Sequence, residues 1–418
     1  MITIAKTSLR IVVLLFFGFL ILQSCAQNNN TVNQSAPDFY LVDSLFNAAL
    51  NNNEMPAAAA YISYYGEEVY HKAYGWKDIE AEKELVISDM FRIASMTKSV
   101  TATAIMQLVE KGLMKLDDPV SKYIPEFKDP QVLIEVLPDS SFTARPAVRE
   151  ITIKHLLTHN AGIGYGFQSD LYNALVIKNG ITEGFEERPI ENLENARKIA
   201  KLPLLHDPGD DFTYSLSFDV LGAVVEIVSG ERLDHYFSRH VFQPLGMNDT
   251  YFYLPDEHKE RLVTVYEHNE EKDGFIQATY PMTEYPIAGA KTYLSGGGDL
   301  SSTVKDIGTY AMMLLRGGEL GNVRILGEEY VNMMKSKQSE HGWWDMETGF
   351  GVNLTTKAGA VVKPQAEGSF EFGGFFDTFC WVDPKNELIA VLFLQMYPNN
   401  EFDVHYKFRT LVYEGIPQ

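Results

Sequence analysis

The sequence predicts an α+β domain in which an antiparallel sheet, flanked by helices, carries a large and mostly helical insertion. Strand-like apolar segments lie near both ends of the 418-residue chain. The middle, at about 113–290, is rich in proline and glycine and shows helical patterns instead. Strands on both sides of a helical middle are typical of the α+β class, because both ends must return to one sheet.

Two hairpins supply the predicted strands. Near the N-terminus, Ala57–Tyr64 and Val69–Tyr74 are short apolar runs joined by a glycine-containing turn. Near the C-terminus, Phe375–Val382 and Leu388–Met396 are joined by a turn with Pro384 at its second position. These four segments are expected to lie in the same sheet.

Helices are predicted from apolar stripes and capping residues. The stretch after Ser95 has a rough apolar stripe and stops at Gly112, so Ser95 should lie at or just before a helix N-terminus. A helix within 299–316 is expected to be capped by Ser301 or Ser302. The other predicted helical segments are 37–53, 151–158, 194–201 and 218–229.

Composition excludes one class of function. The chain has 35 Lys+Arg against 56 Asp+Glu, a formal net charge of −21, and no basic run. Nucleic-acid binding depends on neutralising phosphates with Lys and Arg, so we do not expect a nucleic-acid partner.

The N-terminus is typical of an export signal. Lys6 and Arg10 precede an apolar run, Ile11–Leu22, that is too short for an ordinary membrane-spanning helix. Leu22-Gln23-Ser24-Cys25 resembles the lipobox of bacterial lipoproteins, which implies lipidation of Cys25. We therefore expect a signal peptide at 1–24, a polar tether at 25–36, and a periplasmic or cell-surface lipoprotein exported across the inner membrane of a bacterium. A plain signal peptide with a chance cysteine is the alternative.

The chemistry is suggested by a Ser-x-x-Lys spacing, which places both side chains on one helix face. A serine hydroxyl is a weak nucleophile until a base accepts its proton, and a lysine can be that base. The spacing alone is a weak signal, because it occurs both at Ser95/Lys98 and at Ser302/Lys305. The second pair is explained by a helix cap.

The surroundings of Ser95 separate the two pairs. The flanking residues Phe91-Arg92-Ile93-Ala94-Ser95-Met96-Thr97-Lys98 resemble the nucleophile motif of the serine β-lactamase-like family, which includes class C β-lactamases, D-alanyl-D-alanine carboxypeptidases and related esterases. Further segments match that family in order: Ile151–Gly162, Pro208-Gly209 with Phe212-Thr213-Tyr214-Ser215, Ser295–Gly298 with Leu300–Ser302, and Gly368 with Phe372-Gly373-Gly374. The resemblance spans about residues 40–400. It implies a β-lactamase/transpeptidase-like fold over 37–418, with a helical subdomain at roughly 113–290.

The resemblance also implies roles. Ser95 would attack the substrate carbonyl and form an acyl-enzyme, and Tyr214 and Lys98 would share the proton transfers. Which of these two accepts the serine proton is left open by the sequence. The backbone N–H groups of Ser95 and Phe375 would form the oxyanion hole.

Two departures from the family pattern concern the substrate. Many β-lactamases of the family carry Tyr-x-Asn, and this chain has Leu216 in place of the asparagine. Their third motif begins with lysine, and this chain has Phe372 in its place, before Gly373 and Gly374. Both changes replace polar contacts with apolar surface. We expect Leu216 and 372–374 to contact substrate, and we expect a carboxylesterase acting on small, uncharged acyl esters.

Two alternatives stay open at this point. One is a β-lactamase or D-amino-acid peptidase or carboxypeptidase, and the other is a catalytically silent binding protein on the same fold. His155 and His159 are four residues apart but lack a third ligand, so we expect neither a metal nor another cofactor. The expected partner is a small acyl substrate, with the membrane reached only through lipidated Cys25.

Overall fold

The structure, a computed structural model, describes residues 36–137, 139, 141–271, 273–279, 283–342, 346–397 and 403–417. The predicted signal peptide at 1–24 and Cys25 lie outside these ranges, as does nearly all of the predicted tether. Phe39–Gly415 forms one unit, and the fold of this unit is described below. Within the described ranges, no helix has the length and apolar character needed to cross a membrane.

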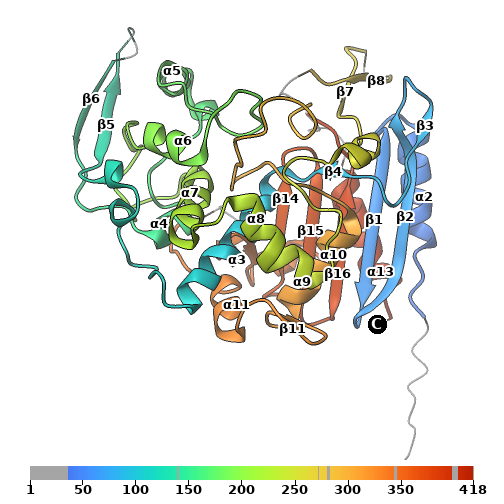
Figure 1. Ribbon diagram of the computed structural model, residues 1–418. Coiled ribbons are helices and arrows are strands. Elements are labelled where there is room, and N and C mark those ends of the chain that lie inside the picture. Colours follow the sequence, from blue (N-terminus) through green and yellow to red (C-terminus); the bar gives the residue numbers. More distant parts are fainter. Residues whose placement is uncertain are drawn as a thin grey trace, which may run out of the picture. The chain divides into compact units, whose positions relative to one another are not determined.

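Within the described residues, this unit contains an eight-stranded sheet (Figure 1). All of its neighbouring strands are antiparallel, and the last long strand along the chain pairs with the first, Phe393 lying opposite Ala59. This confirms that both ends of the sequence contribute to one sheet. The strand order is β12 (Met346–Thr348), β13 (Asn353–Thr355), β14 (Phe370–Gly374), β15 (Thr378–Asp383), β16 (Leu388–Phe393), β1 (Ala57–Tyr64), β2 (Glu67–Asp78) and β3 (Lys83–Glu84).

Helices cover both faces of the sheet. On one face, the Tyr61 ring of β1 lies against α10 (Val304–Leu315), so close that a Cβ on Gly308 would be 2.5 Å from the ring. On the other face, Trp381 of β15 packs edge-on against Phe408 of α13 (Val404–Gly415). Phe408 in turn contacts Phe46 of α2 (Tyr40–Asn51). Every residue of β16 is buried, which explains why this strand is apolar throughout.

The described part of the middle of the chain contains helices joined by long irregular segments, and it also contains hairpins. The hairpin of β5 (Gln131–Val136) and β6 (Phe142–Pro146) was not predicted, because most of its residues are exposed or half-buried and its apolar run, Val132–Ile134, is only three residues long. A second hairpin joins β7 (Tyr266–His268) and β8 (Phe275–Gln277). The subdomain boundary at 113–290 stays a prediction. The helices here are α4 (Ile153–Leu157), α5 (Asp170–Lys178), α6 (Asn192–Ile199), α7 (Ser217–Ser229), α8 (Leu233–Phe237) and α9 (Gln243–Leu245).

Two local predictions were wrong. Ser301 and Ser302 do not cap α10, because their extended backbone forms β9 (Ser301–Ser302), which pairs with β4 (Phe91–Arg92). Thr303 caps the helix instead, its side chain accepting a hydrogen bond from the backbone N–H of Asp306 at 3.2 Å. The strand predicted to begin at Phe375 begins at Thr378, because 375–377 form the turn between β14 and β15.

The helix that follows Ser95 is α3 (Thr97–Glu110), and it is buried on nearly all sides rather than on one stripe. The hydroxyl groups of Thr101 and Thr103 lie within hydrogen-bond distance of the carbonyl oxygens four residues earlier, at 3.3 and 3.1 Å. Thr101 Oγ1 also lies 2.7 Å from the carbonyl oxygen of Gly296. This contact ties α3 to the glycine-rich loop at 295–298.

Candidate active site

Ser95 lies in a short 3₁₀ turn, η1 (Ala94–Met96), between β4 and α3. The turn is held from both sides: the backbone N–H of Ile93 donates to Leu300, and that of Met96 donates back to Ile93. Ala94 has a φ of +43°, a conformation that costs a non-glycine residue free energy. The backbone directly before Ser95 is therefore constrained by its surroundings, and Ser95 itself is half-buried.

The Lys98 side chain returns along the helix face to Ser95, as the three-residue spacing predicts. Lys98 Nζ lies 3.1 Å from Ser95 Oγ and 2.6 Å from the carbonyl oxygen of Gly297. The lysine is only 5% exposed. Its amino group is thus fixed between the hydroxyl of Ser95 and the glycine-rich loop.

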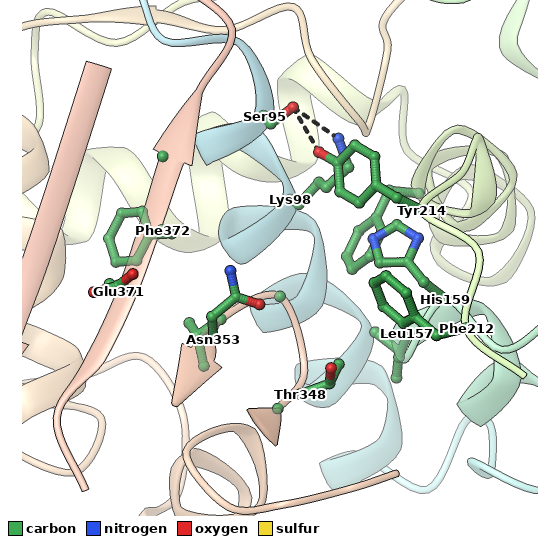
Figure 2. A pocket seen from close by; sticks show the side chains of 15 residues that line it. Ser95, Lys98, Leu157, His159, Phe212, Tyr214, Thr348, Asn353, Glu371 and Phe372 are labelled. Carbon is green, nitrogen blue, oxygen red and sulfur yellow. Dashed lines mark hydrogen bonds between the residues drawn. The ribbon is translucent and has the colours of Figure 1, made fainter. Parts of the chain in front are cut away.

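Tyr214 approaches the same hydroxyl from the other side (Figure 2). Its OH group donates a hydrogen bond to Ser95 Oγ at 2.8 Å, and Lys98 Nζ lies 4.8 Å from the centre of its ring. Lys98 and Tyr214, which are far apart in the sequence, therefore meet at the hydroxyl oxygen of Ser95.

β14 runs beside the nucleophile segment. A Cβ on Gly374 would lie 2.2 Å from the carbonyl oxygen of Ile93, so this approach requires glycine. Phe372 is buried on the same strand and lines the cavity next to Ser95. Phe375 follows in the turn, with its ring stacked on Tyr397 at 3.9 Å between centroids. The role of the Phe375 N–H in an oxyanion hole stays a prediction.

A cavity of about 60 Å³ opens at Ser95 and extends between α3 and β14. Figure 2 shows it bordered on one side by the Tyr214 segment and His159, and on the other by β14 and Asn353. Its apolar walls are formed by Leu157, Phe212, Phe218, Val352 and Phe372. The described part of the chain contains no group of three His, Cys, Asp or Glu side chains positioned to hold a metal ion.

Residues 42–414 match the family model for beta-lactamase, which accounts for most of the chain. The chain belongs to the beta-lactamase family. Its fold, with the large antiparallel sheet flanked by helices, is the fold that the sequence predicted for that family.

Comparison with individual proteins shows which kind of enzyme this chain resembles. This beta-lactamase-family protein is 30% identical over 373 residues to esterase EstB of Burkholderia gladioli, covering 84% of this chain and 88% of the relative. It is 32% identical over 346 residues to an uncharacterized protein of Mycobacterium tuberculosis, covering 79% and 83%. A solved structure of EstCE1, a hydrolase with promiscuous acyltransferase activity, matches with a TM-score of 0.76 at 27% identity over 89% of this chain and 97% of that one. The chain is an esterase-type serine hydrolase.

Not every predicted contact of this beta-lactamase-family chain lies at the cavity. Leu216 has no exposed surface and packs in the hydrophobic core, just before α7, and the side chains around the cavity do not include it. The expectation that Leu216 touches substrate is therefore corrected, because its side chain turns inward at the start of the helix. Phe372 and Gly373 do line the cavity, whereas Gly374 packs against Ile93.

His159 was missed as a site residue because the sequence offered it only as half of a weak metal pair. Its ring lies 4.7 Å from that of Tyr214, and its Nδ1 accepts a hydrogen bond from the backbone N–H of Ser215 at 3.2 Å. Burial, together with the nearby charge of Lys98, lowers the pKa of His159 well below its usual value. A neutral, buried imidazole thus supports the ring of Tyr214.

Two buried acids were also missed, because the sequence shows them only as isolated aspartates. Asp219 accepts hydrogen bonds from Ser295 Oγ at 2.6 Å and from the hydroxyl of Tyr293 at 2.7 Å. Asp299 accepts from the backbone N–H groups of Phe185 and Ser295. Burial raises the pKa of both carboxyl groups, that of Asp299 to about 7. Together they fix the loop whose Gly297 carbonyl holds Lys98.

Proposed function

We propose that this protein is a carboxylesterase that cleaves small, uncharged acyl esters through an acyl-enzyme on Ser95. The observation that carries the proposal is the convergence of Lys98 Nζ and Tyr214 OH on Ser95 Oγ, at 3.1 and 2.8 Å. A nucleophile within hydrogen-bond distance of two groups able to move its proton is the arrangement that covalent ester hydrolysis needs.

In the first half-reaction, the proton of the Ser95 hydroxyl passes to the Tyr214–Lys98 pair while Oγ bonds to the ester carbonyl carbon. The carbonyl π electrons move onto oxygen, and the backbone N–H groups of Ser95 and Phe375 stabilise this oxyanion. When the tetrahedral intermediate collapses, the C–O bond to the alcohol breaks and the pair returns the proton to the leaving oxygen. Water then attacks the acyl-enzyme by the same sequence and releases the acid.

The lining of the cavity supports an ester over a charged lactam or peptide. Phe372, at the start of the third motif, contributes an apolar ring to the cavity wall and offers no polar side-chain contact. A substrate carboxylate placed beside Phe372 would lose its hydration without a compensating partner.

The test compares the wild-type protein with Ser95→Ala on short p-nitrophenyl esters and on a chromogenic cephalosporin. We expect wild-type ester turnover, little cephalosporin turnover, and loss of at least about 10³-fold in the variant. Equal ester hydrolysis by both proteins would contradict the role of Ser95. Rapid cephalosporin turnover without ester turnover would favour the lactamase alternative, and failure of a fluorophosphonate probe to label Ser95 would favour a silent binding protein.

A second candidate activity is acyl transfer to an alcohol, because EstCE1 is a hydrolase with promiscuous acyltransferase activity. An alcohol would replace water in the second half-reaction, with the same atoms reacting. Adding methanol or butanol to an ester assay should then convert part of the acid product to a new ester. Unchanged acid yield at high alcohol concentration would exclude this activity.

We also propose that the protein is exported and anchored to a bacterial membrane through lipidated Cys25, with 25–36 as the tether. Full-length precursor, expressed in a bacterium with alkynyl palmitate, should take up label and fractionate with membranes. Cys25→Ala should abolish both, whereas Cys380→Ala should change neither, because Cys380 is buried in the folded domain. Release of unlabelled wild-type protein would instead indicate a plain signal peptide.

A further inference from the structure

Most polar side chains that line the cavity beside Ser95 already form hydrogen bonds within the protein. Lys98 and Tyr214 are bonded to Ser95. His159 is bonded to Ser215. Glu371 accepts hydrogen bonds from Gln365 Nε2 at 2.8 Å and Arg409 Nη1 at 3.0 Å.

Two polar side chains remain, and they differ in accessibility. Thr348 Oγ1 is buried so completely that solvent does not reach it, and it makes no hydrogen bond within the described ranges. Asn353 is only half-buried, and its side-chain amide likewise forms no hydrogen bond with the described residues. Asn353 therefore has donors and an acceptor left for a ligand on the cavity wall.

Asn353 is well placed for that contact. It begins β13, opposite Glu371 of β14. Two residues earlier, Gly351 packs so tightly on α3 that a Cβ would lie 2.8 Å from the carbonyl oxygen of Lys98. Figure 2 shows the Asn353 amide pointing into the space between β14 and the first turns of α3, on the side of Ser95 and Lys98.

The surroundings decide what kind of group the amide can recognise. Apolar side chains form part of the walls, and the lysine in the cavity is already bonded to Ser95 and Gly297. Glu371, the acid beside Asn353, is compensated by Arg409 and Lys363. An anionic ligand would meet no uncompensated cation, whereas an uncharged oxygen could accept a hydrogen bond from the amide.

We propose that Asn353 is a specificity-determining residue that hydrogen-bonds an uncharged oxygen, ether, hydroxyl or carbonyl, on the part of the ester lying between β14 and α3. The inference rests on the proposed esterase function and narrows its substrates to esters that carry such an oxygen on the group lying between β14 and α3.

Matched ester pairs test this, each pair differing by one oxygen in place of a CH₂ group. Butyl acetate and 2-methoxyethyl acetate probe the alcohol side, and methyl pentanoate and methyl 3-methoxypropanoate probe the acyl side. For each pair we take the ratio of kcat/KM for the ether ester to kcat/KM for the alkyl ester. Asn353→Leu should lower this ratio by about three- to tenfold in one of the two pairs. Asn353→Ala should shift the ratio in the same direction, which guards against a folding defect in one variant.

Thr348→Val is the matched control. It removes a hydroxyl group from the wall of the same cavity, and this hydroxyl is too deeply buried for a ligand to reach. It should leave both ratios at the wild-type value. Ratios that stay at the wild-type value in both Asn353 variants, or that move only in Thr348→Val, would overturn the proposal. These outcomes differ from failure of the esterase function, which would appear as Ser95→Ala turning over all four esters like the wild type.

Discussion

At the scale of single residues, the site is defined by one oxygen atom that receives two hydrogen bonds. Tyr214 contributes more than its hydroxyl, because its ring lies between His159 and the amino group of Lys98. The ring contacts and the hydroxyl can be separated experimentally, since phenylalanine keeps the first and removes the second.

Tyr214→Phe should therefore lower kcat for p-nitrophenyl acetate by about 10²- to 10⁴-fold, the range typical of a lost acid–base group. KM should change little, because the cavity walls are retained. Steady-state kinetics across pH 5–10 and a thermal unfolding curve check both points. A variant with wild-type kcat would remove Tyr214 from the proton transfers, and a large fall in Tm would show that its hydroxyl matters for folding instead.

At the scale of elements, the active site depends on how closely β14 approaches the segment before Ser95. Gly374 makes this possible, because a Cβ there would come within 2.2 Å of the Ile93 carbonyl oxygen and 2.4 Å of Thr378 Oγ1. The Ile93 carbonyl cannot move away without displacing Ser95. β14 cannot move away without displacing Phe375, the predicted oxyanion donor.

Gly374→Ala should cost about 1–3 kcal/mol of unfolding free energy, as overpacking does, and should lower kcat by up to about 10²-fold through displacement of Ser95. Gly373→Ala is the matched control on the same strand. Its Cβ would meet the Phe379 ring at 3.1 Å and the Thr378 carbonyl oxygen at 3.2 Å, both longer than the contacts at Gly374, so the loss of unfolding free energy should be smaller. Chemical denaturation measures this loss in both variants, and equal losses would contradict the argument; ester kinetics measures kcat of Gly374→Ala.

The same elements show what the sequence could predict. The hairpin of β1 and β2, the strand β16 and the position of Ser95 at a helix N-terminus follow from local periodicity and turn residues. The stripe on α3 was only rough because the helix is buried on nearly all sides, so no exposed face interrupts its pattern. Asn353, by contrast, reaches the cavity because 349–353 packs on α3. This tertiary contact leaves no periodicity or turn signal in the sequence, so it could not be predicted.

At the scale of the whole molecule, the buried acids behind the glycine-rich loop link stability to pH. Burial raises the pKa of Asp299 to about 7, well above its usual value. Between about pH 4 and 7 the folded state thus holds a proton on this group that the unfolded state has lost. The contribution of Asp299 to stability is greatest below that window and falls as pH rises through it, by an amount on the order of a few kcal/mol.

We therefore expect the difference in unfolding free energy between the wild type and Asp299→Asn to become smaller as pH rises from 5 to 8. Over this range the wild type loses stability because a buried carboxyl group ionises, whereas the amide of the variant does not titrate. Thermal unfolding of both proteins at pH 5, 6, 7 and 8 gives this difference directly. Asp207→Asn is the control: hydrogen bonds from Arg145 lower the pKa of Asp207 to about 2, so its difference from the wild type should stay constant over the same range. A difference for Asp299→Asn that is constant or grows would mean that the carboxylate is stabilised by its two backbone N–H partners as strongly as by water.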